Sequence, residues 1–332
     1  MPSFPGMATV PDVARAPRVI PLFIVWVCLF GAFLFAAGTA FSAEKSYNLS
    51  PREVAPGTFV FEGRQEYFSF ENGGNIVNTG FIVTETGIIV IDTGPSRLYG
   101  EQMRAAIRQI SVKPIVKVFN THHHPDHFLG NQAYFDTPIT ALSTTREGIV
   151  QEGDTFLQNM YRLAGDFMRG TEVFAPTESI SVSVQTIAGR ELRFYALQGH
   201  DHADLAIFDP TTGVLFAGDL VFKFQAPTTP HAHIGNWLEA LAQLEEIPFR
   251  VIVPGHGPVH RDQSGIAETR DYLTWLEAHL REALAAGADM METMASPLPD
   301  RFADWAVVKE EYARSVSHLF PALEAEILPQ VN

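Results

Sequence analysis

Apolar and polar positions along the chain predict a series of alternating strands and helices. Residues 79–83 and 87–92 are apolar runs separated by Glu85-Thr86-Gly87, which is typical of a hairpin. The run Ile88-Ile89-Val90-Ile91 has no polar member, as expected for a strand that is buried on both faces. Apolar residues then recur at helical spacing over residues 98–110.

The same reading continues to the C-terminus. In residues 180–187 the apolar Ile180, Val182 and Val184 alternate with polar residues, which predicts one half-buried strand. Ser264 is the expected N-cap of a helix that runs to residue 286. Further strands are expected at 57–62, 114–120, near 139, and at 192–196, 203–209, 214–217 and 251–253, with helices at 144–168, 236–244 and 301–327. Alternating strands and helices predict an α/β fold with two packed sheets and helices outside them.

The first 43 residues differ from the rest. Arg15 and Arg18 precede a long apolar run over residues 19–43, which ends in small residues and predicts a secretory signal cleaved after Ala40 or Ser42. The run approaches the roughly 20 residues that span a bilayer, so an uncleaved membrane anchor is the alternative. We therefore expect a periplasmic or secreted protein, or one anchored to the inner membrane by residues 19–43. The expected domains are 1–43 (signal or anchor), 44–262 (the main domain) and 263–332 (C-terminal helices packed on it).

Charge and cysteine content narrow the classes of partner. The formal net charge is −15, which disfavours nucleic acid because such partners require basic faces. Cys28 is the only cysteine and lies in the predicted signal, so the remaining chain has neither a disulfide nor a thiolate ligand. A small-molecule substrate is the expected partner.

The stretch Thr121 to Asn131 carries the candidate chemistry. His122, His124, Asp126 and His127 form the pattern His-x-His-x-Asp-His directly after a predicted strand. Pro125 disfavours helical angles at His124, so the pattern is expected on an extended loop. Side chains two apart on extended chain share a face, so His122 and His124 can bind one ion while Asp126 and His127 turn toward a second.

Three further ligand-type residues each follow an apolar strand and a glycine. They are His200, Asp219 and His256, in Gly199-His200, Gly218-Asp219 and Gly255-His256. One such pair alone is typical of a capped turn. Three of them downstream of His-x-His-x-Asp-His predict a two-ion site.

These motifs resemble those of the metallo-β-lactamase superfamily over roughly residues 57–258. The resemblance implies an αββα sandwich of two mixed β-sheets flanked by helices, with extra C-terminal helices here. It also implies that His122, His124 and His200 bind one ion, that Asp126, His127 and His256 bind another, and that Asp219 bridges both. Asp92 matches a motif that supports the loops and is not a ligand. The ions are expected to be Zn2+, with Fe or Mn as alternatives.

A narrower resemblance points to the quinoprotein relay system zinc metallohydrolases, which are exported proteins. It implies a functional link to a quinoprotein dehydrogenase system, and it rests on Asn120-Thr121-His122 with Pro125-Asp126-His127, Gly218-Asp219-Leu220, Trp237-Leu238 and residues 253–258. Where those relatives have His-Thr, this chain has His200-Asp201-His202. The largest group of true β-lactamases has cysteine at the position of Asp219, and the aspartate resembles the glyoxalase II-type set. Lactonases of the superfamily often carry tyrosine where this chain has Phe222.

The resulting hypothesis is an exported, dinuclear zinc-dependent hydrolase. A hydroxide shared by the ions would attack the carbonyl of an ester, thioester, lactone or lactam, and Asp126 would orient it and pass a proton to the leaving group. The alternatives are a β-lactamase proper, an accessory metal-binding protein of a periplasmic quinoprotein oxidation system, and an iron-dependent oxygenase. His231 and His233 are expected to border the cleft, and His123 to point away from the ions.

Overall fold

The computed structural model describes residues 45–327, and the predicted signal or anchor with Cys28 lies outside them. Within 45–327 no helix combines the length and apolar content that a membrane crossing requires. The strands are β1 (Arg52–Ala55), β2 (Thr58–Phe61), β3 (Thr79–Val83), β4 (Ile88–Ile91), β5 (Ile115–Phe119), β6 (Ile139–Leu142), β7 (Glu178–Ile180), β8 (Ser183–Ile187), β9 (Arg190–Leu197), β10 (Asp204–Asp209), β11 (Val214–Phe222) and β12 (Val251–His256). The α-helices are α2 (Arg97–Ile110), α3 (Pro125–Phe128), α4 (Ser143–Ala164), α5 (Ile234–Glu245), α6 (Ser264–Ala285), α7 (Met290–Met294) and α8 (Val308–Ile327), and short 3-10 turns are η1 (Asn131–Tyr134), η2 (Gly165–Met168) and η3 (Asp300–Phe302).

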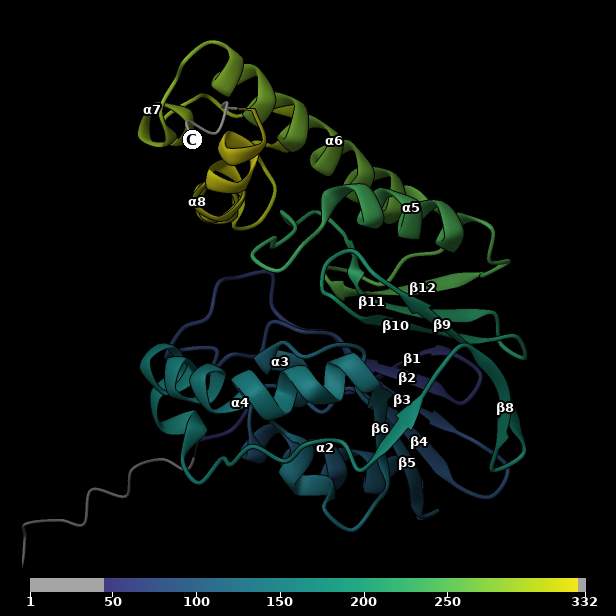
Figure 1. Ribbon diagram of the computed structural model, residues 1–332. Coiled ribbons are helices and arrows are strands. Elements are labelled where there is room, and N and C mark those ends of the chain that lie inside the picture. Colours follow the sequence, from purple (N-terminus) through teal and green to yellow (C-terminus); the bar gives the residue numbers. More distant parts are fainter. Residues whose placement is uncertain (1–44, 328–332) are drawn as a thin grey trace, which may run out of the picture. The chain divides into compact units, whose positions relative to one another are not determined.

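Two mixed sheets form the centre of the fold, with helices on both outer faces (Figure 1). The first sheet has the order β1-β2-β3-β4-β5-β6-β7 and the second β12-β11-β10-β9-β8. Alternate residues of strand β4 pack on opposite faces of the first sheet. Ile89 and Ile91 pack between the sheets, whereas Ile88 and Val90 pack outward beneath α2. The predicted αββα sandwich is confirmed.

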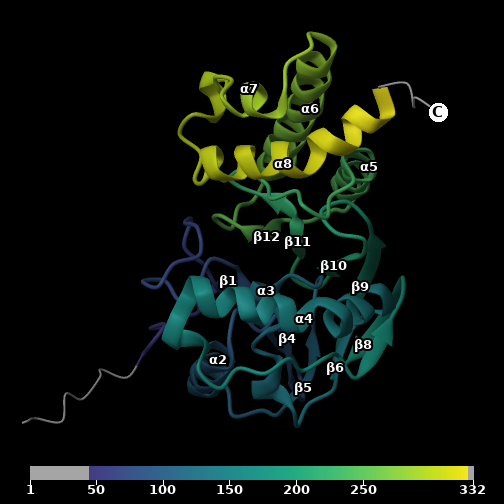
Figure 2. The ribbon, with the colours of Figure 1, turned by 60° about the vertical axis from the view of Figure 1, so that its left-hand side comes forward.

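The second sheet is covered by α5 and α6, and α8 packs against α6. Ile207 of this sheet faces the inter-sheet core, and its neighbour Phe208 belongs to the outer buried cluster, which also contains Trp237 of α5, Leu273 of α6 and Val316 of α8. Figure 2 shows α6, α7 and α8 grouped on this side of the molecule. C-terminal helices are therefore present as predicted, whereas the domain boundary at residue 262 stays a prediction.

Several local predictions were wrong. Residues 180–187 are not one strand: β7 ends the first sheet and β8 begins the edge of the second, because the chain crosses between the sheets there. Val182 and Val184 are consequently 67% and 62% exposed. Ser264 is the first helical residue of α6 and not its N-cap, which is Gln263.

Two further elements differ in extent from the prediction. The expected helix at 301–327 begins only at Val308, after the short turn η3. Strand β11 continues through Asp219 to Phe222 instead of ending at residue 217, with irregular pairing to β12 around Asp219. Asp219 thus lies within a strand, where a pairing irregularity lets its side chain reach the sheet edge.

Hydrogen bonds join the two sheets at the edge where β4, β5 and β12 end. The backbone N–H of Leu205 donates to the carbonyl of Thr121 at 2.8 Å, and that of Asn78 donates to the carbonyl of Gly255 at 2.8 Å. The Asn78 side chain also donates to the carbonyls of Pro254 and Gly257. This edge is therefore held rigidly, and all the predicted ligands lie on it.

Candidate metal centre

The His-x-His-x-Asp-His pattern spans an extended segment and one helical turn. His124 has φ −74° and ψ 149° and is the N-cap of α3, with Pro125 at the first helical position. Proline is favoured there because its missing N–H would have no intrahelical acceptor. Asp126 and His127 therefore lie on a helix, and the prediction of a wholly extended loop was wrong for these two.

One cluster contains His122, His124, His200 and Asp219. Nδ1 of His124 lies 3.0 Å from Nε2 of His122 and 2.7 Å from Nε2 of His200. Oδ2 of Asp219 lies 3.3 Å from Nε2 of His200 and 3.8 Å from Nε2 of His122. All four side chains are buried.

A second cluster contains Asp126, His127 and His256, and the same Asp219 reaches it. Nε2 of His256 lies 3.4 Å from Oδ2 of Asp126 and 3.2 Å from Oδ2 of Asp219. Oδ1 of Asp219 lies 3.1 Å from Nε2 of His127. Asp219 thus lies between the two clusters.

Three buried atoms of these clusters make no hydrogen bond within the described chain. They are Oδ2 of Asp126, Nε2 of His127 and Oδ1 of Asp219. Leaving a buried polar atom without a partner costs about 1–3 kcal/mol, and more for a charged group. Imidazole nitrogens and carboxylate oxygens that converge in this way fit divalent ions.

The outward nitrogen of each imidazole is held by a neighbour. Nδ1 of His200 contacts the carbonyl of Thr228 at 3.0 Å, and Nδ1 of His256 contacts that of Ile76 at 2.9 Å. Nδ1 of His122 lies 3.1 Å from Oγ1 of Thr121. Such contacts fix the ring orientation and leave the other nitrogen free to coordinate.

Asp92 connects the supporting contacts on the first sheet. Its carboxylate accepts the backbone N–H and the hydroxyl of Thr121, both at 2.8 Å, and lies 2.8 Å from Nδ1 of His127. The residue has φ 55°, which is uncommon outside glycine and turns the chain at the end of β4. The geometry agrees with the expected loop-supporting role.

Electrostatics divide the histidines into two sets. Burial lowers the pKa of His122 and His124 well below the usual value, and lowers that of His200 to about 4, so these rings are neutral and able to coordinate. Burial also opposes a charge on His127 and His256, but the carboxylates around them outweigh it and raise their pKa. Asp219 is the strongest of these neighbours, so a positive charge is favoured beside it.

A third group, His123, Asp201 and His231, lies next to the first cluster, and Asp201 had no role in the sequence reading. His123, expected to point away from the ions, is buried, and Asp201 accepts hydrogen bonds from its ring and its backbone N–H. His231 lies 2.8 Å, Nδ1 to Nε2, from His124. His233, by contrast, caps α5 through Asn236. The unusual His200-Asp201 pair was the only sequence signal for this arrangement.

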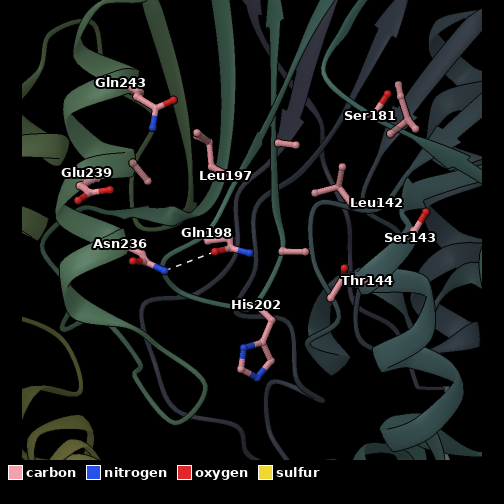
Figure 3. Close-up of a pocket in the computed structure, with 14 residues that line it drawn as sticks. Leu142, Ser143, Thr144, Ser181, Leu197, Gln198, His202, Asn236, Glu239 and Gln243 are labelled. Carbon is pink, nitrogen blue, oxygen red and sulfur yellow. Dashed lines mark hydrogen bonds between the residues drawn. The ribbon is translucent and has the colours of Figure 1, made fainter.

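A pocket of about 100 Å³ opens onto both clusters. Asp126 and Asp219 lie at its metal side, Phe156 and Phe222 form apolar walls, and His231 borders it as expected. A more open hollow of about 530 Å³ lies beyond His202, between α4 and α5 (Figure 3). Its lining contains none of the seven clustered residues, so the smaller pocket is the candidate site.

Comparison with known proteins identifies the family. The model of the metallo-beta-lactamase superfamily matches residues 72–256, which contain all seven clustered residues. The chain belongs to the metallo-beta-lactamase superfamily. The two clusters accordingly fit a dinuclear metal site of the kind found in that superfamily.

Relatives within the superfamily have several activities. A linear primary-alkylsulfatase from a Pseudomonas species is 25% identical over 277 residues, covering 70% of this chain and 52% of that protein. A hydroxyacylglutathione hydrolase from Acaryochloris marina is 30% identical over 141 residues, which cover 40% of this chain and 47% of that protein. The chain thus spans about half the length of the alkylsulfatase it matches.

Solved structures support the fold alone. The metallo-beta-lactamase IND-7 aligns with a TM-score of 0.57 at 19% identity, covering 69% of this chain and all of that one. A metallo-beta-lactamase from Pontibacter korlensis aligns with a TM-score of 0.55 at 22% identity, and the alignment covers 68% of this chain and 99% of that one. This chain therefore shares the architecture of these metallo-beta-lactamases.

Proposed function

We propose that this protein is an exported zinc-dependent hydrolase that cleaves an ester, thioester, lactone or lactam. The observation that carries the proposal is the convergence of seven buried ligand-type side chains into two clusters that share Asp219. A structural zinc requires only four ligands, so seven favour a reactive pair of ions. When bound, such a pair lowers the pKa of coordinated water toward about 7 and polarises the bond to be cleaved.

The chain's own residues would divide the work. His122, His124 and His200 would hold one ion and Asp126, His127 and His256 the other, with Asp219 between them. Asp126 also lines the pocket, and its Oδ2 has no hydrogen-bond partner within the described chain. That oxygen would orient the attacking water and then carry a proton to the leaving group.

The apolar walls and the enclosed position favour a small acyl substrate. Phe156 and Phe222 line the pocket beside Asp126 and Asp219, so an apolar chain can lie next to the reacting group. Aspartate at position 219 and the glyoxalase II-like ligand set favour esters and thioesters over β-lactams. Export would deliver the enzyme to the periplasm, as residues 1–43 indicate.

A substrate panel tests the proposal. The zinc-loaded protein lacking residues 1–43 is offered a thioester, a lactone, a carboxylic ester, a β-lactam and, because of the alkylsulfatase relative, a primary alkyl sulfate. At least one carbonyl substrate should be hydrolysed, with activity lost on chelation and restored by zinc. Asp126→Asn should lower kcat by at least about 100-fold while metal content is retained in part.

The accessory role in a quinoprotein oxidation system gives a different result. If the protein binds two ions but hydrolyses no substrate of the panel, the accessory role is favoured over catalysis. Iron as the bound metal with oxygen consumption would favour the oxygenase alternative. Asp219→Ala should leave fewer than two ions bound, and a variant with full metal content and rate would overturn the bridging role.

A further inference from the structure

The C-terminal helix α8 forms one wall of the pocket. Glu311 and Arg314 of α8 line it together with Thr228 of the loop that follows β11. This loop, residues 225–233, is tied to the helix by a buried contact in which Oγ1 of Thr229 donates to Oγ of Ser315 at 2.8 Å. The pocket is therefore completed by a segment outside residues 72–256, where the family model matches.

Arg314 presents an open edge to this pocket. Its Nη1 donates to Oγ1 of Thr228 at 2.8 Å and pairs with Oε1 of Glu311 at 3.4 Å. Its Nε and Nη2 have no hydrogen-bond partner among residues 45–327, and the side chain is 39% exposed. A guanidinium fixed at one nitrogen, with its remaining N–H groups free, is arranged to bind an oxyanion.

Charge in the pocket makes Arg314 distinctive. Among the residues that line it, Arg314 is the only lysine or arginine. The protein as a whole carries a formal charge of −15, so an anion entering this region would otherwise meet repulsion. On the α8 side of the pocket, Arg314 therefore supplies the positive charge that would distinguish an anionic from a neutral ligand.

Glu311 holds the guanidinium from the protein side. Its side chain is only 6% exposed, and Oε2 is buried without a hydrogen-bond partner in the described chain. Burial raises the pKa of Glu311, although Arg314 opposes this, so negative charge is disfavoured at this carboxyl. The positive charge of Arg314 is therefore only partly cancelled by its neighbour.

We infer that Arg314 is a specificity-determining residue that binds an oxyanion of the substrate, a carboxylate or a sulfate, away from the bond to be cleaved. The inference rests on the proposed hydrolase function, whose substrate class it narrows to anionic acyl compounds. Thr228 connects the two places: its hydroxyl contacts Arg314, and its carbonyl contacts His200 of the first cluster. The oxyanion and the scissile group would thus lie on either side of Thr228.

Two esters of equal length test this inference with the zinc-loaded protein. Mono-p-nitrophenyl glutarate carries a terminal carboxylate, and p-nitrophenyl pentanoate does not. Arg314→Gln should lower kcat/KM for the glutarate ester about tenfold or more, the effect of losing one charge-assisted hydrogen bond. The same substitution should change kcat/KM for the pentanoate ester by less than about twofold. Arg301→Gln is the matched control, because Arg301 lies on the turn η3 and pairs with Asp271. It should leave kcat/KM for both esters unchanged.

A purely structural role for Arg314 predicts something else. If the residue only holds the 225–233 loop, Arg314→Gln should slow both esters equally, as Ser315→Ala should by removing the Thr229 contact. Equal slowing would overturn the inference. Glu311→Gln removes negative charge but keeps an acceptor for Arg314, so it should raise the preference for the glutarate ester; a lower preference would count against the oxyanion site.

Binding measurements separate this inference from the proposed function. Glutarate and pentanoate both offer one carboxylate to the metal side, and only glutarate offers a second to Arg314. Calorimetry should show tighter binding of glutarate in the wild type, and a loss of about tenfold in Arg314→Gln. If glutarate binds more tightly than pentanoate but no substrate of the panel is hydrolysed, the hydrolase proposal is wrong and the oxyanion site is supported. If esters are hydrolysed but glutarate and pentanoate bind equally, only the oxyanion site is wrong.

Discussion

Gly255 decides whether Asp219 can occupy its position between the clusters. A Cβ built on Gly255 would lie 1.8 Å from Oδ1 of Asp219, and 2.9 Å from both its Cγ and its backbone nitrogen. Gly255 does not have a positive φ, so space and not backbone conformation requires glycine here. We therefore expect Gly255→Ala to act on the metal centre through Asp219.

The displacement can be worked out from the same distances. Ordinary van der Waals contact begins at 3.4 Å, so Oδ1 would have to move by about 1.6 Å (3.4 − 1.8). Metal–ligand distances tolerate only about 0.2 Å. A shift about eight times larger would remove Asp219 from its proposed position as a ligand of both ions. Overpacking of this kind also costs about 1–3 kcal/mol of stability.

Metal content and activity provide the assay. Wild-type protein reconstituted with zinc should retain two ions after gel filtration, and Gly255→Ala fewer than one, measured by elemental analysis. Activity on the best substrate of the panel should fall by at least about 100-fold. Gly235→Ala in α5 is the control, because the nearest atom to a Cβ built there, Cε1 of His233, lies 3.4 Å away. It should keep both ions and change stability by no more than about 1 kcal/mol.

A double-mutant cycle separates steric displacement from misfolding. In the Asp219→Ala background there is no carboxylate to displace, so adding Gly255→Ala should cost little further metal affinity. Additive losses would indicate a general folding defect. Full binding of two ions by Gly255→Ala, with wild-type rates, would refute the reasoning.

Three further predictions follow from the contacts around the site. His231→Phe removes the contact to Nε2 of His124 while keeping an aromatic ring, and should weaken metal binding by about 10–100-fold in a chelator titration; unchanged affinity would show that His231 does not position His124. Removing the ions with a chelator should lower the unfolding free energy by about 2.7 kcal/mol for each ion, or about 5.4 kcal/mol for two, relative to protein held with free zinc at 100 times its Kd, and thermal melting with and without zinc checks this. Because the pKa of Glu311 is raised in the folded state, protonation is favoured there and its ionisation destabilises the fold as pH rises through that pKa. In metal-depleted protein Glu311→Gln should therefore be more stable than wild type at pH 8 in urea unfolding, with the difference vanishing near pH 4; a constant difference would contradict the assignment.

Local sequence patterns were sufficient to predict which ligand-type residues cluster and how the layers of the fold are arranged. His-x-His-x-Asp-His places four of the seven side chains in six consecutive positions, where chain connectivity alone keeps them close. The alternation in β4 determined which residues face each layer, because the two-residue period of a strand is a local property. Gly199, Gly218 and Gly255 likewise directly precede the remaining clustered residues, although Gly218 and Gly255 lie within β11 and β12 and not in turns.

Tertiary structure alone decided what surrounds those ligand-type residues. His123 and Asp201 are 78 positions apart, and Thr228 and Arg314 are 86 apart, so no local period connects either pair. The prediction of one strand over 180–187 was wrong for the same reason: Val182 lies where the chain passes between the two sheets, and Val184 lies on β8 at the edge of the second sheet. The sequence determines which side chains can bind a metal ion because that depends on each side chain's own chemistry. The neighbours that orient those side chains, and the cation that faces the pocket, depend on how distant segments pack.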